Sequence, residues 1–234
     1  MKTLPSRLFV TGTSTGVGKT VVSSILTAGL HANYWKPVQS GLEKYPRPAT
    51  DSLWVKKHLQ LDARRIIPEK YLFETPVSPH LAARIEGRQI VLSEIVSSFE
   101  NIDANQALVV EGAGGALVPL NDKHLLVDLM VALQLPVVVV AHSNLLGTIN
   151  HTLMTVEVLR ARGLKILGII LNGKVNLFNL EAIEKYSQVP VIAQIDRLEN
   201  FDRDSLIGCY TRSFDMGYQE KTVEINLSTL GVRI

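Results

Sequence analysis

The stretch that decides the fold is Arg7–Thr20, which reads RLFVTGTSTGVGKT. Leu8, Phe9 and Val10 form a short apolar run, typical of a buried parallel strand, and glycines and small hydroxyl residues follow it. From Val21 onward, apolar residues recur at helical spacing. A strand, a glycine-rich loop ending in Gly-Lys-Thr, and a helix are the context of a phosphate-binding loop. The stretch therefore predicts that the chain binds a nucleoside triphosphate.

The residues of this loop have distinct expected roles. Glycines let backbone N–H groups approach phosphate oxygens, and the N-terminus of the following helix favours negative charge. Lys19 is expected to reach the β- and γ-phosphates, and the hydroxyl of Thr20 to bind Mg²⁺. The nucleotide contacts expected here are Gly16, Val17, Gly18, Lys19, Thr20 and Val21.

The spacing of the loop narrows the class of protein. Five residues separate Gly12 from Gly18, where the standard pattern has four between its first glycine and the Gly-Lys pair. Thr13 thus stands where the usual first glycine would be, as in partitioning ATPases and in ATP-dependent amide- or ring-forming synthetases. Partitioning ATPases carry a second lysine at the position of Ser14, so its absence argues against that branch.

Composition sets the broad class. The 234 residues suit one α/β domain, and 46% hydrophobic with 20% charged residues predicts a large core. A net charge of +2 without a dense Lys/Arg run argues against a nucleic-acid partner. The single cysteine, Cys209, excludes an internal disulfide, and we expect a cytoplasmic protein. We expect no membrane partner, because no apolar run approaches the ~20 residues of a membrane helix and no signal segment is recognisable.

Short apolar runs alternate with helical patterns along the chain. Strands are expected at Leu8–Val10, Asn33–Lys36, Ala107–Val110, Val137–Ala141, Lys165–Leu171 and Val189–Ile195. Helices are expected after Thr20 and at Asp51–Leu59, His80–Glu86, Leu92–Phe99, Leu125–Leu133, Thr148–Arg162 and Leu180–Ser187. Residues 38–50 and 62–79 contain several prolines and are expected to be irregular. For residues 222–227 the pattern allows a strand or an extended tail, and no element is predicted from residue 202 onward.

This alternation predicts the fold class. Parallel βαβ units with helices on both faces give an α/β fold with a doubly wound, mostly parallel sheet, of the P-loop NTPase type. We expect a single domain over residues 1–234, since no linker or internal repeat divides the chain. Ligands of such sheets bind beyond the carboxyl ends of the strands.

Three charged residues lie at expected element ends. Glu111 follows a buried strand and precedes a glycine-rich turn, which places it at a strand tip facing the phosphate loop as a candidate Mg²⁺ ligand. Asp51, at the head of its helix, is either a second ligand or a simple N-cap, for which aspartate is favoured. Lys36 also ends a strand, where a lone lysine is usually solvated.

Several blocks together resemble the dethiobiotin synthetase family. They are Phe9–Thr20, KPVQSG at 36–41, SPH at 78–80, EGAGG at 111–115 followed by Val118-Pro119, LGTINH at 146–151, and Asn172-Gly173. They occur in the family's order and span residues from about 7 to 198. The resemblance implies an ATP- and Mg²⁺-dependent ligase of biotin biosynthesis. Such an enzyme converts diaminopelargonic acid and CO₂ to dethiobiotin, a cyclic urea, and releases ADP and phosphate.

The resemblance also assigns roles at matching positions. Lys19 and Lys36 would be catalytic, because they would neutralise charge on a substrate carbamate and on the transferred phosphoryl group. Thr20, Asp51 and Glu111 would bind Mg²⁺. Further nucleotide contacts would be Asp51, Glu111, Gly112, Ala113, Gly114, Asn172 and Gly173, with Asn172 reading adenine through its amide. Substrate contacts would be Thr15, Ser40, Ser78 and Asn150. The family is a homodimer with the substrate's tail at the interface, where Asn150 would act from the partner subunit.

Departures from the family pattern leave alternatives open. Ser14 stands where the family often has aspartate, and Asp196 stands where its segment near adenine has proline, which puts the preference for ATP in question. One alternative is an amide synthetase of the cobyrinic acid type, which would need a C-terminal glutaminase domain. A second is a nucleotide-switched ATPase, which predicts lysine at position 14 and a basic surface. A third is a degenerate relative that binds nucleotide without biotin chemistry.

Overall fold

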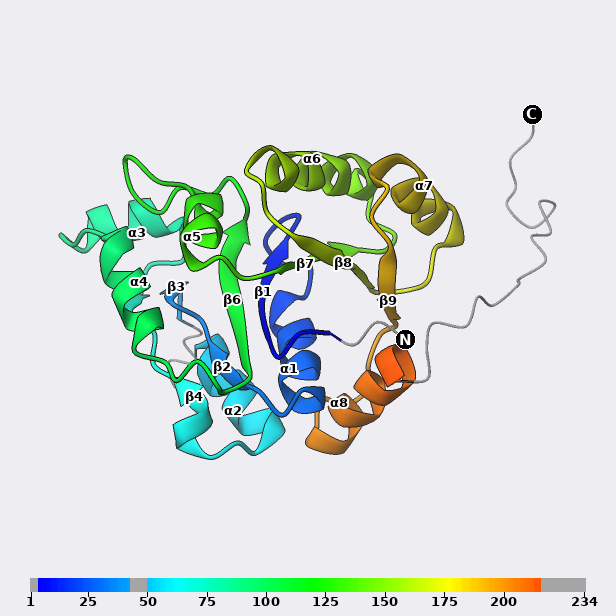
Figure 1. Cartoon of the computed structure of the whole chain (residues 1–234), viewed down its shortest axis with the longest axis horizontal. Coiled ribbons are helices and arrows are strands. Elements are labelled where there is room, and N and C mark those ends of the chain that lie inside the picture. Colours follow the sequence, from blue (N-terminus) through cyan, green and yellow to red (C-terminus); the bar gives the residue numbers. More distant parts are fainter. Residues whose placement is uncertain (1–3, 43–49, 216–234) are drawn as a thin grey trace.

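A seven-stranded sheet forms the centre of the computed structural model, which describes residues 4–42 and 50–215 (Figure 1). From one edge to the other its strands are β4 (Ile66–Ile67), β2 (Asn33–Trp35), β6 (Leu108–Gly115), β1 (Arg7–Gly12), β7 (Val137–His142), β8 (Ile166–Asn172) and β9 (Val191–Ile195). Each neighbouring pair runs parallel. The sheet extends to both sides of β1, with β6, β2 and β4 on one side and β7, β8 and β9 on the other. This arrangement confirms the predicted doubly wound sheet.

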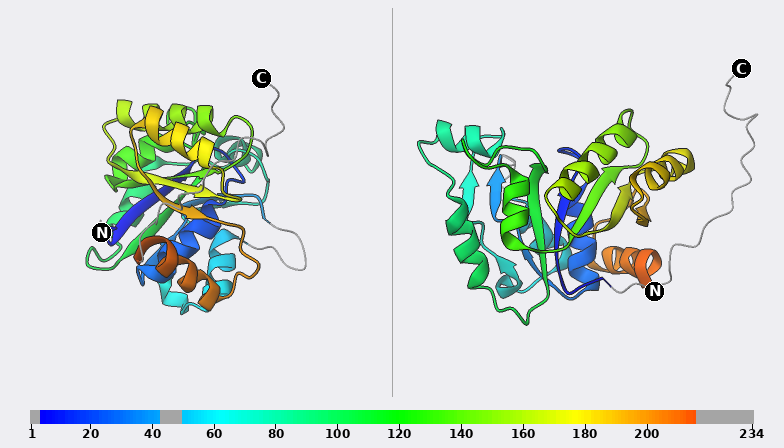
Figure 2. Two further views of the ribbon diagram at one scale, coloured as in Figure 1. Left: turned by 90° about the vertical axis from the view of Figure 1, so that its right-hand side faces the viewer. Right: turned by 45° about the horizontal axis from the view of Figure 1, so that its top comes forward.

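Helices cover both faces of this sheet. One layer consists of α1 (Lys19–Gly29), α2 (Asp51–Leu59) and α8 (Arg203–Tyr210), and it lies below the sheet in the left view of Figure 2. The opposite layer consists of α3 (Pro79–Ile85), α4 (Leu92–Glu100), α5 (Leu126–Leu133), α6 (Thr148–Ala161) and α7 (Leu177–Ser187). Residues Ala63–Arg65 form a turn of 3₁₀ helix, and Thr211–Asp215 a turn of π-helix.

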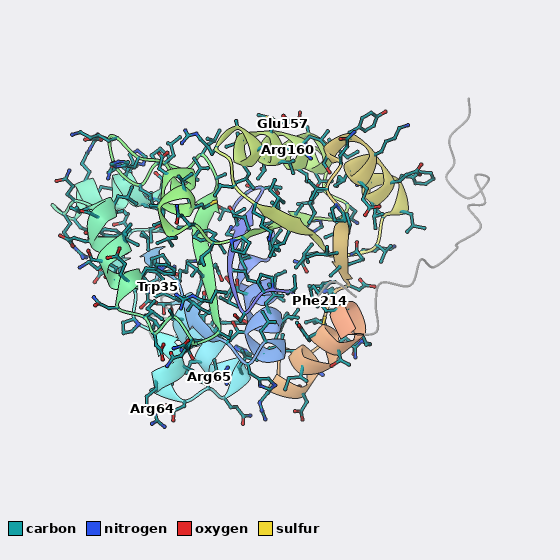
Figure 3. All side chains as sticks on the ribbon, in the orientation of Figure 1. Trp35, Arg64, Arg65, Glu157, Arg160 and Phe214 are labelled. Atoms are coloured by element: carbon teal, nitrogen blue, oxygen red, sulfur yellow. The ribbon has the colours of Figure 1, made fainter. Side chains whose placement is uncertain are left out.

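Alternating side chains of the central strands fill the two halves of the core. Leu8 and Val10 of β1 are fully buried against the α1 layer, whereas Phe9 is fully buried against the α5 and α6 layer. Trp35 of β2, labelled in Figure 3, belongs to the same cluster as Phe9. Strands covered on both faces carry continuous apolar runs instead of an alternating pattern. The apolar run at the start of the chain is explained by this double burial.

Two stretches that the sequence predicts to be irregular contain short strands. Val38–Ser40 (β3) pairs in parallel with Tyr71–Phe73 (β5), and β4 adds an edge strand to the main sheet. β2 ends at Trp35, one residue before the predicted end, and pairing resumes after Pro37. The carbonyl of Pro37 accepts the amides of Lys70 and Tyr71 at 2.9 and 3.0 Å. These strands have only two or three residues and lie in stretches that contain several prolines, so the pattern missed them. Residues 43–49 of the expected loop lie outside the described residues.

The strand that carries Glu111 is longer than predicted. It does not end at Val110 but continues as β6 through the glycine-rich segment to Gly115, which pairs with Gly12 of β1 after a shift in register. Glu111 therefore lies within the sheet, opposite Val10, and not at a strand tip. The absence of a side chain at Gly112 lets Phe9 and Leu126 pack directly against β6, since a Cβ there would lie 2.9 Å from both side chains.

The remaining element ends differ slightly from expectation. Helix α7 begins at Leu177, three residues earlier than predicted, with Asn176 as its N-cap. Helix α8 occupies part of the region for which nothing was predicted, and residues 222–227 lie outside the described residues.

Glu157 and Arg160 form an ion pair at 3.4 Å on the outer face of α6 (Figure 3). Within the part of the chain that the structure describes, no helix has the length and apolar character needed to cross a bilayer.

Candidate active site

The loop between β1 and α1 has the backbone geometry of a phosphate cradle. Gly16 and Gly18 have φ angles of 79° and 94°, in the left-handed region that favours glycine. A Cβ on Gly18 would lie 2.0 Å from the amide nitrogen of Asn172, so only glycine fits there. The Nζ of Lys19 donates to the backbone carbonyl of Ser14 at 2.9 Å. The lysine therefore folds back along the loop, and Ser14 contributes its backbone to this contact.

Lys19 is a buried lysine whose positive charge an anionic ligand would stabilise. Its side chain is buried, and this burial lowers its pKa from 10.5 to about 8, with the charge of Glu111 opposing the shift and that of Lys36 adding to it. The phosphate oxygens of a nucleotide would supply the negative charge that a buried ammonium lacks.

A buried carboxylate joins three elements below the loop. Glu111 of β6 is fully buried. Its Oε1 accepts hydrogen bonds from the Thr20 hydroxyl of α1 at 2.9 Å and from the Lys36 Nζ at 3.0 Å, while its Oε2 accepts one from the Tyr34 hydroxyl at 2.9 Å. Lys36, directly after β2, also forms an ion pair with Asp51 of α2. A buried carboxylate with three donors is satisfied as a charged group.

Lys36 is a permanent cation at neutral pH. Burial acts to lower its pKa, but the charges of Glu111 and Asp51 and the hydrogen bonds to them prevail and raise it to about 12. The neighbouring Tyr34 has a pKa well above its usual value, because of its burial and then the charge of Glu111. Lys36 is therefore not the solvated lysine that is usual at the end of a strand, since only 6% of the residue is exposed.

The capping question at α2 is decided by Thr50. Its side chain accepts a hydrogen bond from the backbone N–H of Leu53 at 3.2 Å and is the N-cap of the helix. Asp51 is therefore not the cap, and its carboxylate turns toward Lys36. This leaves Asp51 in the first turn of α2, facing the same space as Thr20 and Glu111.

This oxygen-rich group fits Mg²⁺. A hydroxyl and two carboxylates, from Thr20, Asp51 and Glu111, are hard ligands that line one cavity with the phosphate loop. Among residues 4–42 and 50–215, no group of three or more His, Cys, Asp or Glu side chains is placed to hold a metal by itself. Such a sparse protein shell suits Mg²⁺, which keeps several waters and shares its coordination with substrate phosphates.

A cavity of about 590 Å³ brings most of the predicted site residues together. It lies between the phosphate loop, the end of β2, β6 and the start of α3. The predicted residues that line it are Thr15, Gly16, Gly18, Lys19, Thr20, Val21, Lys36, Ser40, Asp51, Ser78, Glu111, Ala113 and Gly114. Gln39 and Val118 also line it; both belong to blocks that resemble the family, but the sequence assigned neither a role. Pro76, Val77 and Pro79 complete the lining. Tyr34, behind the cavity, was missed too, although it stands two residues before Lys36 on the same face of a strand.

Five predicted residues lie elsewhere. Val17 and Gly112 do not line the cavity: Val17 is buried, and Gly112 packs under Phe9. Asn172 and Gly173 line a second hollow, of about 610 Å³, with Asp196 and Arg197. The amide nitrogen of Asn172 donates to the Val17 carbonyl at 3.0 Å and so supports the phosphate loop. Asn150 is exposed on the first turn of α6 and does not line the cavity of its own chain.

Comparison with known proteins supports one family. A family model described as an AAA domain matches residues 6–205. ATP-dependent dethiobiotin synthetase BioD of Rhodopseudomonas palustris strain TIE-1 is 41% identical over 212 residues, which is 91% of this chain and 96% of that protein. BioD of Brucella ovis is 42% identical over 209 residues, which is 89% of this chain and 94% of that protein.

Solved structures confirm the fold class. MinD in the MinC:MinD complex of Aquifex aeolicus aligns with a TM-score of 0.53 at 13% identity, over 88% of this chain and 94% of that one. A ParA family ATPase from Chlorobium tepidum aligns with a TM-score of 0.50, also at 13% identity, over 89% of this chain and 92% of that one. Identities this low show a shared fold alone. The sequence match over nine-tenths of the chain goes further, and the chain belongs to the ATP-dependent dethiobiotin synthetase family.

Proposed function

We propose that this chain is an ATP- and Mg²⁺-dependent dethiobiotin synthetase that carboxylates diaminopelargonic acid with CO₂ and closes the ureido ring. The observation that carries the proposal is that Lys36 lines the same cavity as the phosphate loop. Hydrolysis of a nucleotide needs the loop and Mg²⁺, whereas a second buried cation beside the γ-phosphate position suits an anionic co-substrate such as a carbamate. The identity to BioD proteins supports the same activity.

The chemistry consists of two displacements. One amine of the substrate takes up CO₂ to form a carbamate, whose oxygen attacks the γ-phosphorus of ATP while the bond to the ADP oxygen breaks. The second amine then attacks the carbamate carbon, and the C–O bond to phosphate breaks as the ring closes. The products are dethiobiotin, ADP and inorganic phosphate, and the amine protons leave to solvent.

The residues of the cavity have matching tasks. The backbone of the phosphate loop would hold the nucleotide, with Lys19 neutralising the β- and γ-phosphates. Lys36, charged at neutral pH, would neutralise the carbamate and the transferred phosphoryl group. Thr20, Asp51 and Glu111 would hold Mg²⁺, which supplies further charge neutralisation at the phosphate oxygens. Thr15, Ser40 and Ser78, which also line the cavity, would contact the diamine.

We further propose a homodimer that forms through the start of α6. Three large apolar side chains are exposed there, with exposed fractions of 57% for Leu145, 103% for Leu146 and 56% for Met154. Met154 also lines, together with Leu117, an apolar hollow of about 360 Å³ whose lining includes Thr15 of the phosphate loop. Several exposed large apolar side chains on neighbouring segments are typical of a protein interface. Asn150 lies in the first turn of the same helix, so a dimer formed here would include Asn150 of both copies in its interface.

The remaining proposals follow from this function. A biosynthetic enzyme that consumes ATP is expected in the cytoplasm, and we propose that residues 1–234 form a single domain. The hollow that contains Asn172 and Gly173 is the proposed adenine site. Asp196, which lines it, would be the source of any altered preference among nucleotides.

The deciding experiment measures ADP release from Mg·ATP and bicarbonate, with and without diaminopelargonic acid. We expect release that depends on the diamine and a product with the mass of dethiobiotin. Release that is indifferent to the diamine would contradict the synthetase and favour a nucleotide-switched ATPase. The variant Lys36→Met is the control, because it should retain ADP binding through the phosphate loop while losing the diamine-dependent release.

A further inference from the structure

Tyr34 is joined to the proposed magnesium site from behind. Its side chain is fully buried, and its hydroxyl donates to the Oε2 of Glu111 at 2.9 Å. It does not line the cavity, so it cannot touch nucleotide, metal or substrate there. We propose that Tyr34 is a positioning residue that orients the carboxylate of Glu111 for Mg²⁺. This inference rests on the proposed function only in taking Glu111 as a metal ligand.

The pairing of β2 with β6 explains how a tyrosine comes to this place. Tyr34 lies opposite Val109 in the parallel register, and side chains two residues apart share a face of the sheet. Tyr34 and Lys36 therefore stand on the same face as Glu111, and both donate to its carboxylate. Trp35 points to the opposite layer, where it packs with Phe9.

The two oxygens of Glu111 have separate partners. Oε1 meets the Thr20 hydroxyl and the Lys36 ammonium, both of which line the cavity. Oε2 meets the Tyr34 hydroxyl, and within the described residues the structure records no other hydrogen bond to this oxygen. Rotation of the carboxylate would break the bond to Tyr34 and leave a buried charged oxygen without a donor, which is unfavourable. The tyrosine thus keeps Oε1 directed at Thr20.

Removal of the hydroxyl should release this orientation. In a Tyr34→Phe variant the aromatic ring still fills the core, but Oε2 loses its donor. Lys36 is then the charged donor beside Glu111, and a turn of both carboxylate oxygens toward its ammonium would give Oε2 a new hydrogen-bond donor. Such a turn withdraws Oε1 from the hydroxyl of Thr20 and weakens the binding of Mg²⁺.

Tyr71 offers a matched control on the other side of the sheet. Its hydroxyl donates to the carboxylate of Glu94 at 2.9 Å and accepts the backbone N–H of Val91 at 3.0 Å. It is also buried, with 5% of the residue exposed, and it does not line the cavity. The variants Tyr34→Phe and Tyr71→Phe therefore each remove a hydroxyl that donates to a carboxylate, but only the first removes it from Glu111. The side chain of Glu94 is 51% exposed, so water can replace the donor that it loses.

The experiment titrates Mg²⁺ while ADP binding is measured by calorimetry. For Tyr34→Phe we expect the Mg²⁺ concentration at half-maximal effect to rise about tenfold, since a hydrogen bond to a charged group is lost. ADP affinity in EDTA should stay within about twofold of the wild type. For Tyr71→Phe both quantities should remain unchanged. An equal shift in the two variants, or no shift in Tyr34→Phe, would overturn the proposal.

A double-mutant cycle separates positioning from a general loss of stability, and it also serves if Tyr34→Phe alone folds poorly. In a Glu111→Gln background no buried charge is left unpaired, and Tyr34→Phe should change the Mg²⁺ midpoint by less than about twofold. An effect as large as in the wild-type background would show that Tyr34 does not act through Glu111. These measurements use ADP and Mg²⁺ alone, so they remain valid even if the diamine assay refutes the synthetase.

Discussion

Replacement of Lys36 by methionine tests the core of the site. The change keeps an unbranched apolar stem as far as the Cε position but removes the ammonium that pairs with both Asp51 and Glu111. The Lys36 side chain is 7% exposed, that of Glu111 is fully buried and that of Asp51 is 32% exposed. Loss of one partner from a buried ion pair costs about 3–5 kcal/mol. Since Asp51 is partly solvated and Thr20 and Tyr34 still donate to Glu111, we expect about 3 kcal/mol.

This loss should be visible in unfolding experiments. In EDTA, a change of about 3 kcal/mol corresponds to a fall in melting temperature of about 6–12 °C for a chain of this size, which should remain folded at room temperature. Mg²⁺ with ADP should restore part of the loss, because a divalent cation would then lie between the same carboxylates. Diamine-dependent turnover should fall about 100-fold or more.

Lys70→Met is the control for this variant. Lys70 pairs with Glu94 at 3.0 Å, but the two side chains are 33% and 51% exposed, so its loss should cost less than about 1 kcal/mol. If Lys36→Met is no less stable than Lys70→Met, the buried network does not have the energy assigned to it. If Lys36→Met keeps near wild-type turnover, Lys36 is not a catalytic residue.

Three further predictions follow from the same geometry. The pKa of Lys19 falls from 10.5 to about 8 on folding, so the unfolded chain binds more protons than the folded chain between these pH values. Urea unfolding in EDTA should therefore show a free energy of unfolding that rises by up to about 3 kcal/mol from pH 8 to 10.5. A Lys19→Met variant should lack this rise. Thr20→Val removes the hydroxyl that meets Glu111, and turnover should need about tenfold more Mg²⁺; an unchanged Mg²⁺ dependence would exclude Thr20 as a ligand. Leu146→Asp should convert the proposed dimer to a monomer in light scattering, whereas Leu53→Asp, at an exposed position on α2, should not; a dimer that survives Leu146→Asp would place the interface elsewhere.

Some features depended on contacts that the sequence does not show. The strands β3 and β4 escaped prediction because they are short and lie in stretches that contain several prolines. Their partners β5 and β2 lie about thirty residues away along the chain. The glycines after Glu111 resembled a turn, yet they extend a strand because β1 pairs with them up to Gly115. In both cases the pairing of distant segments decided the local structure.

The site residues also divide into those that the sequence predicts and those that depend on contacts between distant segments. Lys19 and Thr20 could be assigned from the sequence because a strand, a glycine loop and a helix form within one short stretch of chain. Asp51 could not, since a ligand and an N-cap look alike until the side chain of Thr50 is seen to cap the helix. The buried state of Lys36 was equally hidden, because it depends on two carboxylates, 15 and 75 residues further along the chain.

The sequence by itself determined the phosphate loop, the alternation of strands and helices, and hence the doubly wound parallel sheet. These features rest on local backbone preferences and on the burial of strands on both faces, which are written in consecutive residues. Only the tertiary structure decided which charges meet. Tyr34, Lys36 and Glu111 face one another because β2 pairs with β6 in one particular register, and a shift by one residue would point Glu111 into the opposite layer.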